Sequence, residues 1–382
     1  MKRIVWILTA AVLALTALPL GARGVELEVG GKSALLMDAA TGTVLYEKNA
    51  HERLAPASVT KIMTLLLIME AIDSGKIAWE DSVTTSQTAA AKGGSQVYLK
   101  VGETMTVSEM VKCIAVSSAN DCACAMAEHL AGSEGAFVEE MNARAESLGM
   151  ADTHFVNCTG LDDGADAAEH RTSAYDIAIM SRELLTRHPD IRQYTTIWMD
   201  TIRDGTFGLS NTNKLVRFYN GCTGLKTGFT SGAGYCLSAT ALREDMELIA
   251  VVMGCTTSKE RTAACRTMLD YGFAQYALIR PALGEDLTVP VTLGRRERVR
   301  AELGEAGGLL IDKGQKAGVE TEVTLEESVM APVSRGQRLG TMTVRSGDTV
   351  LAQIPLVAGE QVERKSWGDL ILTVLRRVAM AA

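Results

Sequence analysis

The chain has 382 residues, which is long for one typical domain and predicts two domains, or one large domain with an appendage. Hydrophobic residues make up 47% and charged residues 22% of the chain, an ordinary globular composition that gives no reason to expect disorder. The formal net charge of -8 argues against a nucleic-acid-binding protein, because such proteins usually carry a basic surface.

The N-terminus is typical of an export signal. Lys2 and Arg3 supply a positive start, and an apolar run follows from Ile4 to Leu18. We therefore predict a signal peptide over residues 1–24, although Leu20 stands where a small residue is preferred before cleavage. The alternative is an uncleaved anchor, and in both cases the rest of the chain is exported.

Residues 25–280 mix helix and strand patterns and predict one α+β domain. The apolar positions of its first long helix fall on every face, so we expect that helix to be buried all round. The predicted elements, in chain order, are strands over Ser33–Asp38 and Thr43–Lys48, helices over Ala57–Asp73, Val107–Val116, Asp121–Ala131, Gly135–Leu148 and Ser173–Thr186, strands over Tyr235–Leu242 and Leu248–Met253, and a helix over Ser258–Ala277.

The pattern changes near Pro281 and Gly284, which indicate a linker. Short alternating runs separated by glycine-containing turns then predict a small all-β domain over residues 285–360. The predicted strands are Leu287–Leu293, Thr321–Leu325, Thr341–Val344 and Val350–Pro355.

The last segment, residues 362–382, has the pattern of an amphipathic helix. Trp367, Leu370, Ile371, Val374, Leu375 and Val378 form one stripe, and arginine and lysine residues lie around the rest. A basic amphipathic helix with a tryptophan, a residue that favours the membrane interface, predicts attachment to a membrane surface. The alternative is a terminal helix that packs on the all-β domain.

Eight cysteines lie at positions 113, 122, 124, 158, 222, 236, 255 and 265. An even number in an oxidising compartment permits disulfides. Most of these cysteines fall in apolar segments, where a free thiol behaves as a small hydrophobic side chain, so we predict mostly free, buried thiols. No cysteine–histidine cluster has zinc-ligand spacing, and we expect no metal and no cofactor.

Ser58-Val59-Thr60-Lys61 is the first candidate for chemistry. Residues three apart share a helix face, so the Ser58 hydroxyl and the Lys61 amine can meet near the start of the helix. A serine needs a neighbouring base to become a nucleophile, and a desolvated lysine near other positive charge can be that base. Alone the pattern is weak, because the serine can also be a helix N-cap beside an unrelated lysine.

Ser118-Ala119-Asn120 is the second candidate. The Ser118 hydroxyl can pass a proton between a lysine and a leaving amine, and the Asn120 amide can bind a substrate carbonyl. On its own the segment is better explained as a cap, with Asn120 or Asp121 beginning a helix.

Lys226-Thr227-Gly228 is the third candidate. A strand lysine that faces the pocket would add positive charge and so keep Lys61 deprotonated. Thr227 can bind a carboxylate, and Gly228 would leave room for a peptide-like substrate beside the backbone. The alternative is an ordinary lysine at the end of a strand.

The order of the three motifs makes them specific. They follow as S-x-x-K, S-x-N and K-T-G, with spacings of 60 and 108 residues. This triple resembles that of penicillin-binding proteins and class A β-lactamases, with Ala119 where S-D-N has aspartate. The resemblance to the D-alanyl-D-alanine carboxypeptidases also includes Pro56–Thr64, Thr153–Asn157 with Gly160-Leu161, Lys226–Thr230 with Ala233-Gly234-Tyr235, and Arg261 through Asp270-Tyr271-Gly272-Phe273.

The resemblance implies a fold. We expect an α+β, penicillin-binding/β-lactamase-like catalytic domain, which is an antiparallel sheet with a helical subdomain. A small all-β domain and a C-terminal amphipathic helix complete the family's outline.

The resemblance also implies a reaction. Ser58 would attack the carbonyl between two D-alanines and form an acyl-enzyme, with Lys61 as general base and Ser118 and Lys226 completing the proton path. Backbone N–H groups of Ser58 and Phe229 would form the oxyanion hole. The implied substrate-binding residues are Asn120, Lys226, Thr227, Gly228, Phe229 and Arg261; the arginine would bind the terminal carboxylate directly or through water, unless it is an ordinary surface helix residue.

Four alternatives to this function make different demands on the sequence. A class A β-lactamase would need an E-x-x-L-N stretch between the second and third motifs, and none is present. A serine esterase related to the β-lactamases is a second alternative. A non-catalytic β-lactam-binding envelope protein predicts decay in a motif, yet all three are intact. A zinc carboxypeptidase needs a metal-ligand set, and the five histidines are scattered.

The expected partners follow from the resemblance. They are peptidoglycan stem peptides as substrates, β-lactam antibiotics as covalent inhibitors, and a membrane surface through the C-terminal helix, with no nucleic acid. We expect a peripheral protein on the outer face of the cytoplasmic membrane, extracellular or periplasmic.

Overall fold

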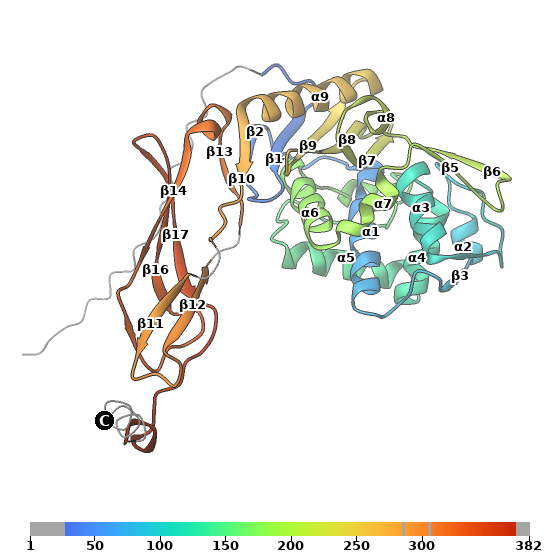
Figure 1. Ribbon diagram of the computed structural model, residues 1–382. Helices are drawn as coiled ribbons and strands as arrows, with labels where there is room; N and C mark the ends of the chain where they lie inside the picture. The colour runs from blue at the N-terminus through green and yellow to red at the C-terminus, as the bar shows by residue number, and fades with distance from the viewer. Residues whose placement is uncertain (1–26, 285–286, 305–306, 372–382) are drawn as a thin grey trace, which may run out of the picture.

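A computed structural model describes residues 27–284, 287–304 and 307–371 (Figure 1). The predicted signal peptide lies outside these residues, as does the predicted C-terminal helix beyond residue 371. In the described part, an α+β domain is followed by an elongated all-β domain, as predicted.

A five-stranded antiparallel sheet, in the order β2-β1-β9-β8-β7, forms the centre of the first domain. Its strands are β1 (Ser33–Asp38), β2 (Val44–Lys48), β7 (Cys222–Thr230), β8 (Gly234–Arg243) and β9 (Met246–Cys255). The four strands predicted with bounds in this domain are confirmed as β1, β2, β8 and β9, and β7 contains the third motif, whose lysine was expected on a strand.

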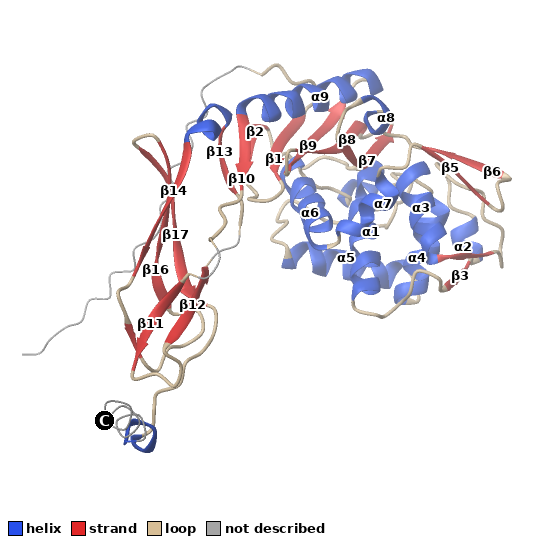
Figure 2. Cartoon of the chain, viewed as in Figure 1, coloured by secondary structure: helices blue, strands red, loops and turns tan. Residues whose placement is uncertain are grey.

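Both faces of the sheet are covered, as Figure 2 shows. Side chains alternate between the faces, so Leu36 and Leu248 pack with helix α9 (Ser258–Gln275), while Leu35 and Ile249 pack with the helical subdomain on the other side. This double burial explains why β1 and β9 read as continuous apolar runs.

The helical subdomain is built around α1, which is buried on nearly every face, as predicted. Its elements are the 3-10 turn η1 (Ala57–Thr60), α1 (Lys61–Asp73), α2 (Gln87–Ala90), α3 (Val107–Ser117), α4 (Asn120–Ala131), α5 (Glu134–Ser147), α6 (Ala174–Arg187), α7 (Arg192–Thr195), and the strand pairs β3 (Ser82–Thr84) with β4 (Thr104–Thr106) and β5 (Met199–Ile202) with β6 (Phe207–Ser210). The short helix α8 (Leu215–Phe218) packs instead with α9, through Leu215. Local signals set several starts; Thr106 and Glu109, for example, form a capping box at α3.

Helix α9 ends earlier than predicted. The sequence pattern extends the helix to Ala277, but the chain leaves it at Tyr276 and forms β10 (Tyr276–Ile279). Strand β10 pairs with β13 (Leu309–Asp312), so a partner strand far along the chain overrides the helical pattern. This pairing joins the two domains.

The all-β domain is a six-stranded sheet in the order β14-β16-β17-β12-β11-β15. Its strands are β11 (Thr288–Thr292), β12 (Arg298–Leu303), β14 (Val319–Leu325), β15 (Val329–Met330), β16 (Arg338–Ser346) and β17 (Thr349–Ala358), and the 3-10 turn η4 (Lys313–Gly318) precedes β14. The four predicted strands are confirmed, whereas β12, β13 and β15 were not predicted.

The C-terminal segment turns helical at residues 367–371, where the described chain ends. The Trp367 side chain is 83% exposed and that of Ile371 is 59% exposed, so neither packs on the all-β domain. Among the residues described, no helix is both long and apolar enough to cross a membrane.

All eight cysteines are free thiols, as predicted for most of them. Seven are buried and Cys222 is half-buried. They therefore contribute to packing rather than to covalent cross-links in this structure.

We predict that Leu248→Ala lowers the free energy of unfolding of the first domain by about 2–5 kcal/mol, because it leaves a cavity between β9 and α9. Urea denaturation followed by tryptophan fluorescence measures this change. Leu242→Ala is the matched control, since that side chain is 41% exposed and its loss should change stability by less than about 0.5 kcal/mol. Equal effects of the two substitutions would contradict the assigned core.

Candidate active site

The first motif places a serine and a lysine together, as predicted. Ser58 lies in η1, half-exposed, and Lys61 is fully buried at the start of α1. The Lys61 Nζ atom is 2.9 Å from Ser58 Oγ and donates a hydrogen bond of 2.7 Å to the carbonyl of Thr159. Ser58 does not cap the helix, so its hydroxyl is directed at the lysine.

The second motif follows α3. Ser118 adopts a left-handed conformation, with φ 62° and ψ 30°, which ends α3 and lets the chain turn into α4. Asn120 begins α4, but the N-cap residue is Ala119, and no side chain caps the helix. The helix start predicted at Asn120 or Asp121 is therefore confirmed, but no side chain of the motif caps this helix. The Asn120 Nδ2 group donates to the carbonyl of Gly93 at 2.7 Å, and its buried Oδ1 has no hydrogen-bond partner among the described residues.

The third motif lies in the middle of β7. Lys226 is buried, and its Nζ donates to Ser118 Oγ and to the Thr227 carbonyl, both at 2.9 Å. The Thr227 hydroxyl is 2.6 Å from that of Thr212. Two serine–lysine pairs from three distant segments thus meet at β7, an edge strand of the sheet.

Gly228 is also required for a packing contact that the sequence did not indicate. A Cβ atom at this position would lie 2.7 Å from the carbonyl oxygen of Pro56 and 3.1 Å from the backbone nitrogen of Ser58. The nucleophile turn itself packs on Gly228, and this contact requires glycine. The next residue, Phe229, is 53% exposed, and its ring centroid lies 4.3 Å from that of Tyr235.

Burial lowers the pKa of both lysines. Desolvation of the ammonium lowers the pKa of Lys61 to about 7, against the opposing effect of Cys158 and Asp121. Burial also lowers the pKa of Lys226 well below its ordinary value, and the charges of Lys61 and Arg261 add to this effect. The sequence suggested that the charge on Lys226 keeps Lys61 neutral. In the structure, burial is the main cause that favours the neutral amine of Lys61.

Arg261 is a buried residue of α9 rather than a surface one. Its Nη1 donates to the carbonyls of Gly228 at 3.0 Å and Cys236 at 3.3 Å, and the guanidinium lies 5.4 Å from the Tyr235 ring centroid. The arginine therefore supports β7 directly behind the third motif.

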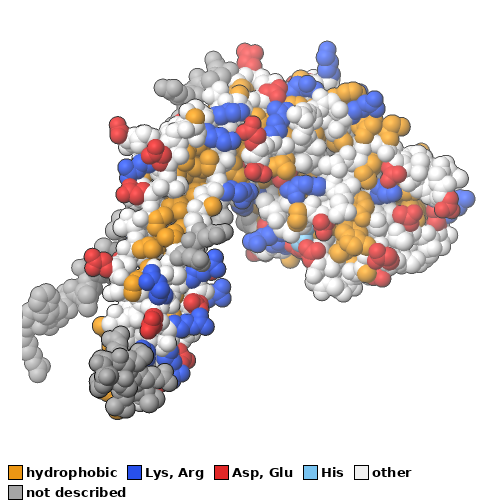
Figure 3. All heavy atoms as spheres, viewed as in Figure 1, with side chains coloured by type: hydrophobic (Ala, Val, Ile, Leu, Met, Phe, Trp, Pro, Cys, Tyr) orange, Lys and Arg blue, Asp and Glu red, His pale blue; other side chains and the backbone are white. Residues whose placement is uncertain are grey.

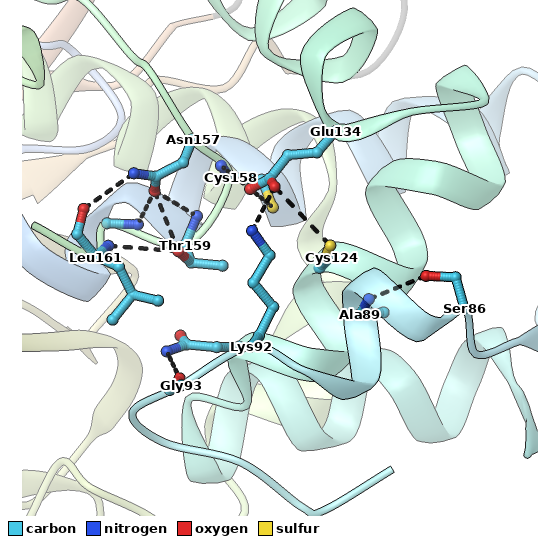
Figure 4. Close-up of polar contacts among 12 residues, drawn as sticks. Ser86, Ala89, Lys92, Gly93, Cys124, Glu134, Asn157, Cys158, Thr159 and Leu161 are labelled. Atoms are coloured by element: carbon cyan, nitrogen blue, oxygen red, sulfur yellow. Dashed lines mark hydrogen bonds and ion pairs between the residues drawn. The ribbon is translucent and has the colours of Figure 1, made fainter. Parts of the chain in front are cut away.

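One part of the site was not predicted from the sequence. The loop 157–161 is held by the Asn157 side chain, whose Oδ1 accepts hydrogen bonds from the backbone N–H of Thr159 and Gly160 and whose Nδ2 donates to the carbonyl of Leu161 (Figure 4). This fold presents the Thr159 carbonyl to Lys61. Because a backbone atom makes the contact, no side chain in the sequence signals it.

An ion pair supports the same loop from the other side. Lys92 binds Glu134, the first residue of α5, and Glu134 also accepts hydrogen bonds from the backbone N–H and the thiol of Cys158, both at 3.3 Å (Figure 4). The hydrogen bond with Cys124 and burial raise the pKa of the Cys158 thiol well above its ordinary value, which disfavours the reactive thiolate.

Comparison with known proteins agrees with this geometry. The family model described as D-alanyl-D-alanine carboxypeptidase matches residues 22–257, and that described as the penicillin-binding protein 5 C-terminal domain matches residues 283–364. The D-alanyl-D-alanine carboxypeptidase DacF of Bacillus subtilis is 43% identical to this chain, over 99% of this chain and 98% of its own length.

Two solved structures are also similar. Penicillin-binding protein 5 from Haemophilus influenzae superposes with a TM-score of 0.75 at 29% identity, over 88% of this chain and 98% of its own. Penicillin-binding protein D2 from Listeria monocytogenes, solved in an ampicillin-bound form, gives a TM-score of 0.59 at 30% identity, over 65% of this chain and 99% of its own. The chain therefore belongs to the D-alanyl-D-alanine carboxypeptidase family of serine hydrolases.

Proposed function

We propose that the chain removes the terminal D-alanine from peptidoglycan stem peptides through an acyl-enzyme on Ser58. One observation carries this proposal: two serine–lysine pairs, Ser58 with Lys61 and Ser118 with Lys226, lie together, each with a nitrogen–oxygen distance of 2.9 Å. Burial lowers the pKa of both lysines. A neutral buried amine beside a half-exposed hydroxyl is the arrangement that nucleophilic catalysis by serine requires.

In acylation, Ser58 Oγ attacks the carbonyl carbon between the two D-alanines while the Lys61 amine takes the hydroxyl proton. The backbone N–H groups of Ser58 and Phe229 stabilise the oxyanion. A proton then reaches the leaving nitrogen through Ser118, which Lys226 holds at 2.9 Å. The carbon–nitrogen bond breaks, D-alanine leaves, and water later hydrolyses the ester.

The remaining residues bind substrate in this proposal. Asn120 orients the peptide, and its buried, unpaired Oδ1 supports this role. Thr227 and Arg261 help to bind the terminal carboxylate of the substrate. Because Arg261 donates a hydrogen bond to the Gly228 carbonyl, it would do so indirectly, by holding strand β7 or through a water molecule. Phe229 is exposed at the rim of the site.

β-Lactams are proposed to react at the same serine. Attack on the lactam carbonyl opens the ring, but the leaving nitrogen stays attached to the acyl group, so it continues to block the site. The related Listeria penicillin-binding protein in its ampicillin-bound form supports this proposal.

We predict that Ser58→Ala abolishes the covalent adduct with benzylpenicillin, because the attacking oxygen is removed. Intact-mass analysis of residues 25–360, with release of D-alanine from a peptide ending in D-Ala-D-Ala, measures both activities. Ser74→Ala, an exposed serine at the end of α1, is the control and should behave as the parent. An adduct that survives in Ser58→Ala would refute the nucleophile. In the parent, an adduct without D-alanine release would favour a transpeptidase or sensor, and rapid penicillin turnover would favour a β-lactamase.

Acylation should rise with pH through the pKa of Lys61, about 7, and then level off. Only the neutral amine accepts a proton, so well below that pKa the rate should fall about tenfold per pH unit. Stopped-flow acylation by a chromogenic cephalosporin between about pH 5 and pH 9 measures this, with circular dichroism at each pH to show that the fold persists. A rate independent of pH over that range would contradict Lys61 as the base.

We also propose that the C-terminal segment attaches the protein to the outer face of the cytoplasmic membrane. Trp367 and Ile371 are exposed, and Figure 3 shows lysine and arginine side chains gathered on the end of the all-β domain next to this segment. Arg295, near this end, contacts the same segment through its backbone N–H, which donates to the Glu363 carbonyl. Exposed apolar and basic groups together suit an anionic lipid surface.

Sedimentation with vesicles containing phosphatidylglycerol tests this attachment. We predict that a chain spanning residues 25–382 pellets with the vesicles, whereas one spanning residues 25–360 stays in the supernatant. Binding should weaken at high salt, because its electrostatic part is screened. If both chains stay in solution, the membrane proposal is wrong.

A further inference from the structure

The peptide group that joins Ala57 to Ser58 is held at its carbonyl end. The Ala57 carbonyl oxygen accepts a hydrogen bond of 2.8 Å from the Thr60 hydroxyl. In a trans peptide the N–H points away from the C=O of the same group. Whatever fixes the direction of the Ala57 carbonyl therefore also fixes the direction of the Ser58 N–H, the proposed oxyanion donor.

Thr60 is in turn held by a histidine 110 positions along the chain. The Thr60 hydroxyl oxygen is 2.8 Å from Nε2 of His170, and His170 Nδ1 accepts a hydrogen bond of 3.1 Å from the backbone N–H of Val156. Since Nδ1 is an acceptor, the proton of the neutral ring is on Nε2. The Nε2–H group then donates to the Thr60 hydroxyl oxygen, and the Thr60 hydroxyl donates to the Ala57 carbonyl. The donor and acceptor of each hydrogen bond in this series, from Val156 to Ala57, are thereby defined.

The series is buried and uncharged. Thr60 is fully buried and His170 is 3% exposed. Burial lowers the pKa of His170 to about 4, and electrostatic interactions with His154, Arg171 and Lys61 act in the same direction. At neutral pH the ring is thus neutral, which is the form that this arrangement needs.

The backbone around the peptide group explains why it must be held. Ala57 has φ +48°, a left-handed conformation that is unfavourable for a residue with a side chain. Gly160 packs on its carbonyl so closely that a Cβ there would lie 1.8 Å from the oxygen, and Gly228 packs on the other side against the Ser58 nitrogen. The turn is strained and enclosed, and hydrogen bonds from Thr60 stabilise it in one orientation.

We infer that His170 and Thr60 are positioning residues that orient the Ser58 N–H toward the oxyanion through the Ala57 carbonyl. Neither residue touches the substrate, and this role rests on the proposed acyl-enzyme on Ser58. Loss of an oxyanion donor typically slows acyl transfer by about 100- to 1,000-fold. If only the orientation of this donor is lost, the rate of acylation should fall by roughly 10- to 100-fold. The affinity of the initial, non-covalent binding step should not change.

Two matched pairs of variants test the inference. Thr60→Val removes the hydroxyl at nearly constant volume, and Thr60→Ser restores it. His170→Phe keeps a ring without a donor, and His170→Gln returns an N–H group near the Nε2 position. His154→Gln changes an exposed neighbouring histidine and serves as control. We expect benzylpenicillin to acylate Thr60→Val and His170→Phe slowly. Thr60→Ser and His170→Gln should keep most of the parent's acylation rate, and the control His154→Gln should react as the parent does.

An infrared measurement separates orientation from general damage. Hydrogen bonds in the oxyanion hole polarise the ester carbonyl of the acyl-enzyme and lower its stretching frequency. The ester band should therefore move to higher frequency in Thr60→Val and return in Thr60→Ser, at a melting temperature that shows both are folded. If His170→Phe fails to fold, the Thr60 pair still decides.

A folded Thr60→Val that acylates at the parent rate with an unshifted ester band would overturn the inference. Slow acylation with an unshifted band would also overturn it, because Thr60 would then act on something other than the oxyanion hole. If the parent itself shows no ester on Ser58, it is the proposed function that fails, and that outcome is visible before any variant is made.

Discussion

The site depends on the burial of two lysines, Lys61 and Lys226, close to each other. A buried ammonium group is costly, and two of them close together are more so; the protein relieves this cost by lowering both pKa values until the neutral amines are favoured. Every other feature of the site serves this state. The Thr159 carbonyl and the hydroxyls of Ser58 and Ser118 satisfy the amines without adding negative charge next to them.

The site also depends on close packing of the backbone around the turn that carries Ser58. The nucleophile turn lies between Gly160 on one side and Gly228 on the other, and neither position has room for a Cβ atom. Three segments are thus brought together by contacts of backbone on backbone, which leave the Ser58 hydroxyl half-exposed while Lys61 stays dry. This arrangement combines access for a substrate with the desolvation that makes the base effective.

Side chains outside the motifs hold the backbone atoms that the chemistry uses. Asn157 folds the loop that carries Thr159, Arg261 binds the carbonyl of Gly228, and His170 acts on Ala57 through Thr60. Each of these polar groups is buried or half-buried and fixes a peptide group from behind. The all-β domain takes no part in this network; it extends away from the site and carries the C-terminal segment at its far end (Figure 1).

The sequence by itself determined the fold class, most helices and strands, and the four candidate side chains Ser58, Lys61, Ser118 and Lys226, because these depend on local periodicity and on short motifs. Ser58 and Lys61 meet because they are three residues apart in one helical turn. Tertiary structure alone decided the early end of α9, the glycine requirement at Gly228 and the role of His170. Those features arise from contacts between segments dozens to more than a hundred residues apart, with separations of 110 for His170 and Thr60 and 98 for Lys61 and Thr159. Such contacts leave no local pattern, and several of them use backbone atoms that every residue shares.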